Sequence, residues 1–198
     1  MSEFINQLQS TSLIEWLASL FALIYIYLAY KNLSLCFVFG LISSILWAYY
    51  SYEILNLKFD GSLQVFYGLM SFYGLYVWKY GGDNNSSKPI SYLSLKSNLI
   101  WIMGGLVAVI VIYLWAERYI ESSRTFLDIF TTVYSIIGTF LLVYRKIENW
   151  IIFIIADLLY IYIYYSQGAY VFVMMMIIYI LIAIPSWFNW KRIYLESV

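Results

Sequence analysis

The chain has 198 residues, of which 64% are hydrophobic, 22% are aromatic and only 11% are charged. Ordinary soluble domains are about 25% charged, so this composition excludes a water-covered globular fold and indicates a membrane protein. Eleven basic residues balance eleven acidic ones, and the zero net charge argues against nucleic acid as a partner. With no histidine and a single cysteine, Cys36, a structural zinc site and a disulfide framework are excluded, and we expect no cofactor.

The N-terminal residues 1–9 precede the first apolar stretch. In a helix they place Phe4, Ile5 and Leu8 on one face, which predicts a short helix at the membrane interface. They contain no basic region that leads into a short apolar core, so we expect no cleaved signal peptide.

Seven apolar stretches follow, each about long enough to cross a bilayer, which takes about 20 mostly apolar residues in a helix. They are residues 13–30, 33–55, 63–80, 98–115, 125–144, 150–165 and 170–190. The longest polar stretch between them, residues 81–96, is too short to bury a core of its own. We therefore predict a single all-α transmembrane domain over residues 1–198, with seven membrane-spanning helices.

The last three stretches repeat features of the first three. In each half an acidic residue leads into the first stretch, which ends in tyrosine and a basic residue, and the third stretch ends in tryptophan and lysine. The matching residues are Glu15, Tyr30, Lys31, Trp78 and Lys79, then Asp128, Tyr144, Arg145, Trp190 and Lys191. This 3+1+3 pattern predicts two parallel three-helix bundles, residues 13–80 and 125–190, joined by a linker helix at 98–115.

Basic residues are unevenly distributed over the two sides of the predicted membrane domain. One side collects eight of them and the other side three. The eight are Lys31, Lys79, Lys88, Lys96, Arg145, Lys146, Lys191 and Arg192, and the three are Lys58, Arg118 and Arg124. Because cytoplasmic loops retain lysine and arginine, the distribution predicts an N-terminus outside the cell and a cytoplasmic C-terminus.

Membrane proteins built from such repeats bind small molecules near the midplane, between the halves, which predicts a small-molecule carrier. The chain has no GxxxxGK[ST] phosphate loop, no GxSxG motif and no histidine to act as a general base. We therefore expect no enzyme activity. Transport would be passive, coupled to an ion, or drawn by chemistry elsewhere in the cell.

Asp157 lies in the middle of the sixth stretch, where an ionisable side chain costs at least about 2.5–3.5 kcal/mol and therefore faces protein or water. No lysine or arginine occurs at similar depth, so the carboxyl stays protonated, meets a cation, or bonds to another helix. Phe153, Tyr160 and Tyr164 share its helical face, which forms a site for a flat or cationic organic group. In so aromatic a chain, such neighbours also arise without any function.

Other stretches carry polar faces that add candidate binding residues. These are Ser43 and Trp47 in the second stretch, Gln64 and Tyr67 in the third, and Asp128 in the fifth. Such faces fit a solvated path, and they fit hydrogen bonds between helices almost as well.

Several blocks of residues are together typical of one family. The most specific is Leu63-Gln-Val-Phe-Tyr67 with Tyr73-Gly-Leu-Tyr-Val-Trp78, and the others are Glu15-Trp16, Tyr27-Leu-Ala-Tyr-Lys31, Phe39-Gly40, Glu148-Asn149-Trp150 and Asp157. Through them the whole chain resembles the PnuC vitamin transporters, which are distant structural relatives of the SWEET sugar carriers. The resemblance implies a facilitator in the bacterial inner membrane that is homotrimeric, with a cytoplasmic kinase trapping the substrate without contacting the carrier. It also adds Asn149 and Trp150 to the candidate substrate-binding residues.

The resemblance leaves the substrate open between two cationic vitamins. Members that carry nicotinamide riboside typically have WxxxNxxW, where this chain has Phe153-Ile-Ile-Ala-Asp157-Leu-Leu-Tyr160. An aspartate pairs with the pyridinium of nicotinamide riboside or the thiazolium of thiamine, and the aminopyrimidine of thiamine can also donate to it. Nicotinamide riboside is slightly favoured as the commonest substrate of the family, and thiamine is the alternative. A SWEET-like sugar carrier and an accessory subunit of a larger transporter remain as further hypotheses.

Overall fold

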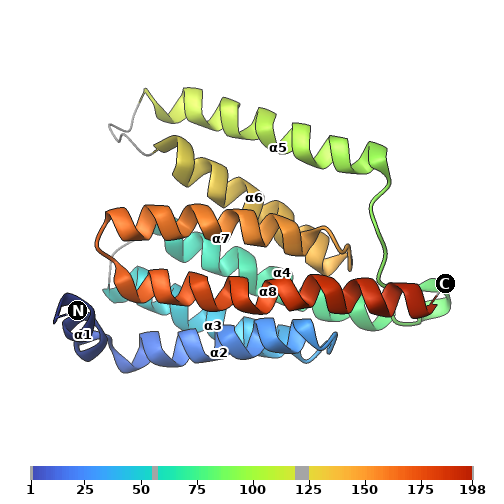
Figure 1. Ribbon diagram of the computed structural model, residues 1–198, viewed down its shortest axis with the longest axis horizontal. Coiled ribbons are helices and arrows are strands. Elements are labelled where there is room, and N and C mark those ends of the chain that lie inside the picture. The colour runs from blue at the N-terminus through green and yellow to red at the C-terminus, as the bar shows by residue number, and fades with distance from the viewer. Residues whose placement is uncertain (1, 55–57, 119–124, 198) are drawn as a thin grey trace.

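The computed structural model describes residues 2–54, 58–118 and 125–197, and Figure 1 shows the arrangement of its helices. The described residues form α-helices and contain no β-strand. The helices are α1 (Ser2–Ser10), α2 (Leu13–Tyr30), α3 (Cys36–Tyr49), α4 (Lys58–Tyr80), α5 (Leu95–Ala116), α6 (Thr125–Val143), α7 (Asn149–Ser166) and α8 (Tyr170–Ser197). A π-helical turn, η1 (Tyr50–Ile54), continues α3, and a 3₁₀ turn, η2 (Asp83–Asn85), lies in the loop after α4.

The predicted all-helical fold is confirmed, and each predicted stretch coincides with a helix. Six segments within the described residues are long and apolar enough to cross a membrane: Leu13–Tyr30, Cys36–Ile54, Leu95–Ala116, Phe126–Val143, Asn149–Ser166 and Tyr170–Ser197. The remaining predicted span lies in α4, which has 23 residues but is less apolar because Gln64 and several glycines and tyrosines interrupt it. α4 also begins earlier than predicted, at Lys58, and α8 continues past residue 190 to Ser197.

Helix contacts link the two groups of three. α3 packs between α2 and α4, and α7 packs between α6 and α8. α2 also packs on α8, and α4 on α6, so the contacts run in a closed circuit through six helices. α5 lies at the margin against α6 (Figure 1). A Cβ on Gly105 would lie 2.6 Å from Ile137 of α6, whereas Gly104 has no atom within 4 Å, so α5 has one packed face and one open face.

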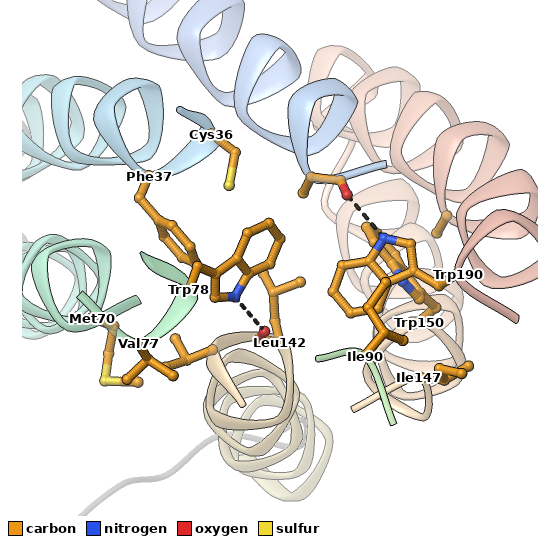
Figure 2. Close-up of a cluster of buried hydrophobic side chains, with 13 residues drawn as sticks. Cys36, Phe37, Met70, Val77, Trp78, Ile90, Leu142, Ile147, Trp150 and Trp190 are labelled. Carbon is orange, nitrogen blue, oxygen red and sulfur yellow. Dashed lines mark hydrogen bonds between the residues drawn. The ribbon is translucent and has the colours of Figure 1, made fainter. Parts of the chain in front are cut away.

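A cluster of buried apolar side chains lies at the end of the bundle where α2 and α6 terminate and α3 and α7 begin. Figure 2 shows that it contains side chains from both groups of helices, with Trp78 and Trp190 near its middle. The loop after α4 closes this end by pairing Ser91 with Lys146 in an isolated bridge. Large apolar side chains elsewhere are exposed on the outside, as expected for surfaces that face lipid.

At the other end, the predicted N-terminal helix is present as α1 and is held by one side chain. Gln7 Nε2 donates to the Gly168 carbonyl at 2.5 Å, and Gln7 Oε1 accepts from the Tyr170 amide at 2.9 Å. Gln7 thereby bonds α1 to the turn between α7 and α8. α2 then begins in a capping box, in which Ser12 and Glu15 each accept the other's backbone N–H.

We predict that Gln7→Ala will speed hydrogen exchange at the Tyr170 amide by about fivefold, because one hydrogen bond contributes about 1 kcal/mol. Exchange followed by mass spectrometry on peptides that span the α7–α8 turn measures this. Gln9→Ala is the matched control, since Gln9 is exposed on the same helix. Equal exchange in both variants would contradict a specific role for Gln7.

Candidate binding site

Asp157 lies on α7 with a side chain that is buried, at 8% exposure. Within the described residues, no hydrogen bond or ion pair to the Asp157 carboxyl is present. The described part of the chain does contain an ion pair between Arg192 and Glu196, which lies on the surface of α8. A charged carboxyl that is buried without a basic partner is costly, and a bound cation would offset that cost.

Two tyrosines from other helices lie within electrostatic range of this carboxyl. They are Tyr67 of α4 and Tyr179 of α8, one from each group of three helices. Tyr164 of α7 interacts with both phenols, and Tyr25 of α2 lies near both as well. Phenol groups from α2, α4, α7 and α8 therefore converge near Asp157, and each can donate or accept a hydrogen bond.

A row of aromatic rings continues from this group. Tyr160 stacks on Tyr164 with ring centroids 5.6 Å apart and an interplanar angle of 13°. Tyr164 contacts Phe172 of α8 at 5.2 Å, and Phe172 contacts Trp47 of α3 at 6.0 Å. The structure thus places Tyr67 near the acid together with Tyr160 and Tyr164, and it connects Trp47 to Tyr164 through Phe172.

Sequence reasoning missed Tyr25, Phe172 and Tyr179. A signal for Tyr179 was present, because Tyr67 and Tyr179 each lie eleven residues before the tryptophan that ends the third stretch, Trp78 or Trp190. Aligning the two halves on these tryptophans pairs the two tyrosines. Tyr25 and Phe172 carry no comparable signal in so aromatic a chain.

Four of the predicted residues make packing contacts. Ser43 Oγ donates to the Ala18 carbonyl of α2 at 2.8 Å. Asn149 Nδ2 donates to the Lys146 carbonyl at 2.6 Å, and Trp150 of the buried cluster packs edge-on against Trp190 at 5.3 Å, so both lie at the closed end. Phe153 packs on α6 at Gly138, where an added Cβ would lie 2.9 Å from the ring.

The last two predicted residues lie apart from the acid's aromatic neighbours. Gln64 lines an outer groove of about 240 Å³ between α3 and α4, with Val65, Leu69 and other apolar side chains. Asp128 is exposed in the first turn of α6, where a carboxylate complements the positive end of the helix dipole. Among the described residues, no group of three or more His, Cys, Asp or Glu side chains comes together as metal ligands.

Comparison with known proteins agrees with this architecture. The chain matches the family described as nicotinamide mononucleotide transporter over residues 12–192. Its structure is similar to the crystal structure of the vitamin B3 transporter PnuC, with a TM-score of 0.77 and 21% sequence identity. The match covers 99% of this chain and 88% of that one. At this level of identity, the agreement shows a shared fold.

Proposed function

Because this chain belongs to the nicotinamide mononucleotide transporter family, we propose that it carries a cationic vitamin into the cell by facilitated diffusion. Membership makes it a multi-pass membrane transport protein and not an enzyme. Nicotinamide riboside is slightly favoured and thiamine is the alternative. The observation that carries the proposal is Asp157, buried without a basic partner near Tyr67 and Tyr179 and beside the ring row of Tyr160 and Tyr164.

A flat organic cation suits this group of side chains. The carboxylate balances its charge, and tyrosine faces attract cations through their ring quadrupoles. A phosphate, by contrast, would approach a buried carboxylate that has no basic partner, and like charges repel strongly where water is scarce. The proposal therefore favours a nucleoside or thiamine over a mononucleotide.

We take Asp157, Tyr160, Tyr164, Tyr67 and Trp47 as the central part of the proposed binding site. Phe153, Ser43, Gln64, Asn149, Trp150 and Asp128 are proposed as an outer set that supports the helices around it or borders the path. The packing bonds of Ser43 and Asn149 support this division.

The proposed architecture has seven spans, with α4 as the span whose lower hydropathy sets it apart. It consists of the three-helix bundles 13–80 and 125–190 with the linker helix 98–115, the N-terminus outside and the C-terminus in the cytoplasm of a bacterium. The contact of α2 with α8 and that of α4 with α6 support two related halves, because each joins the first helix of one half to the third helix of the other. A homotrimer in the inner membrane and trapping by a cytoplasmic kinase complete the proposal.

Reconstituted liposomes test the transport activity. We expect labelled nicotinamide riboside or thiamine to exchange across the membrane with saturation, and the unlabelled compound to compete. A tryptophan-fluorescence screen against both vitamins and riboflavin identifies the ligand, since the chain has eight tryptophans. Uptake of neither vitamin at micromolar concentration contradicts the proposal, and competition by glucose would favour a sugar carrier instead.

A further inference from the structure

Two indole hydrogen bonds join the two halves at the closed end of the bundle (Figure 2). Trp78 Nε1 of α4 donates to the Leu142 carbonyl of α6 at 3.1 Å. Trp190 Nε1 of α8 donates to the Ala29 carbonyl of α2 at 3.0 Å. Each bond runs from the last helix of one half to the first helix of the other. We call these two bonds the indole latches.

The carbonyls that accept these bonds occupy equivalent positions. Ala29 and Leu142 lie three residues before Asn32 and Arg145, which have φ values of 58° and 53°. The same two carbonyls accept the backbone N–H of Asn32 and of Arg145, in the left-handed turns that end α2 and α6. Each latch therefore attaches to a helix C-terminus, where carbonyl oxygens lack partners within the helix.

The rings around the latches are arranged in the same way. Phe37 packs edge-on against Trp78 at 5.0 Å, and Trp150 packs edge-on against Trp190 at 5.3 Å. Phe37 and Trp150 each lie five residues after the left-handed residue of their own half. Trp78 and Trp190 also touch one another, with centroids 5.6 Å apart. The two latches thus meet as a nearly symmetric pair.

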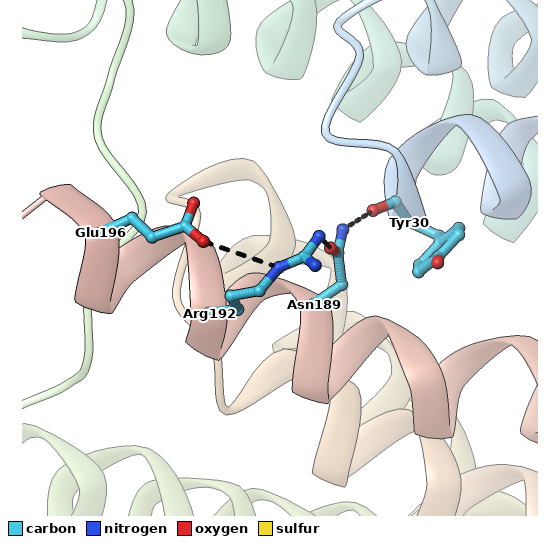
Figure 3. Close-up of polar contacts among 4 residues, drawn as sticks. All are labelled: Tyr30, Asn189, Arg192 and Glu196. Carbon is cyan, nitrogen blue, oxygen red and sulfur yellow. Dashed lines mark hydrogen bonds and ion pairs between the residues drawn. The ribbon is translucent and has the colours of Figure 1, made fainter.

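Both latches are removed from solvent, since Trp78 is 1% and Trp190 0% exposed. Separating the halves at this end would leave two buried indole donors without acceptors, which is unfavourable unless water enters. A third bond supports the Trp190 side, where Asn189 Nδ2 donates to the Tyr30 carbonyl at 2.8 Å (Figure 3).

The Trp78 side has a different support. The Arg145 guanidinium lies over the Trp78 ring at 4.3 Å and donates to the Lys88 carbonyl in the loop after α4. Burial lowers the pKa of Arg145 to about 10, which leaves it charged at neutral pH. This latch is therefore held by a cation–π contact in addition to its hydrogen bond.

We propose that Trp78 and Trp190 form a paired gate, in which both latches break together when this end of the bundle opens toward Asp157. Asp157 lies seven residues after Trp150 on α7, about 10 Å along the helix axis at 1.5 Å per residue. Opening this end would therefore uncover a path of two helical turns to the acid. The gate does not depend on which substrate is carried. A result that contradicts the proposed function would therefore leave the paired gate untested by that result, and the gate has its own experiment below.

The native thiol of Cys36 reports this opening without any added probe site. Cys36 is 0% exposed and belongs to the same buried cluster as both latches. The rate of its modification by a maleimide, in detergent and without substrate, measures how often this end opens. Trp78→Phe and Trp190→Phe remove each indole donor while keeping an aromatic ring, and Trp187→Phe is the matched control one turn earlier on α8.

We expect each single latch variant to react about fivefold faster than the wild type, since one hydrogen bond contributes about 1 kcal/mol, and the double variant about 25-fold faster. The Trp187→Phe rate should equal that of the wild type. A Trp190→Phe rate at the control value would overturn the paired gate, because Trp78→Phe alone could expose Cys36 by local repacking. If the double variant does not fold, Asn189→Ala provides the second test. It leaves both indoles in place and must also speed the reaction, and an unchanged rate overturns the proposal.

Discussion

Asp157→Ala is expected to weaken binding of a cationic vitamin by about 30-fold or more, because losing one member of a buried charge pair costs at least about 2 kcal/mol. The variant removes the charged side chain of the central part of the proposed site, while the tyrosines around it keep their rings. Titration of the purified protein with nicotinamide riboside or thiamine, followed by tryptophan fluorescence, measures the effect.

Asp157→Asn separates the two candidate substrates. The amide cannot balance a charge or accept two hydrogen bonds as a carboxylate does, so thiamine binding should fall strongly. Nicotinamide riboside should lose less, because an amide suits its neutral carboxamide. Asp83→Asn, in the exposed turn η2, is the matched control and should leave both affinities unchanged. Unchanged affinity in Asp157→Asn for both vitamins would rule out the acid as their partner.

Gly74→Ala is expected to lower the melting temperature by at least about 2 °C, because overpacking a buried contact costs about 1–3 kcal/mol or more. A Cβ at this position of α4 would lie 2.2 Å from Cε1 of Phe37. Phe37 cannot move aside freely, since it is buried and packs edge-on against Trp78. Thermal unfolding followed by light scattering or by a thiol-independent dye gives the measurement.

Gly104→Ala provides the matched comparison within the same chain. No atom lies within 4 Å of the Cβ that it would add, and the residue is on the open face of α5. Alanine favours the helix over glycine by about 1 kcal/mol, so the melting temperature should stay the same or rise slightly. A similar loss in both variants would show that close packing of α3 on α4 is not the cause.

Hydropathy predicted the helices well because a membrane-spanning helix needs a long apolar stretch whatever its neighbours are. It was less informative for α4, whose polar and small residues lower its hydropathy although it is long enough. The caps and turns that set helix ends, such as the left-handed turn at Arg145, depend on individual backbone angles that composition does not reveal.

The candidate site was predicted in part for a similar reason. Tyr160 and Tyr164 share a face with Asp157 on one helix, so spacing alone was enough to group them. Tyr25 and Phe172 come from other helices, and their approach depends on how each helix is rotated against its neighbours. The resemblance added Asn149 and Trp150 to the candidate residues, and the structure places them at the closed end, where Asn149 bonds the Lys146 carbonyl and Trp150 packs on Trp190.

The crossed arrangement of the indole latches has a consequence for how the two groups of helices pair. Each indole adds a second hydrogen bond to a helix-end carbonyl of the other group of three helices, beside the bond that this carbonyl already accepts from its own turn. Two identical copies of one half would form both bonds with the same surface, as an isologous dimer does. The crossed bonds are therefore the contacts that two copies of one three-helix group would make if they paired with each other.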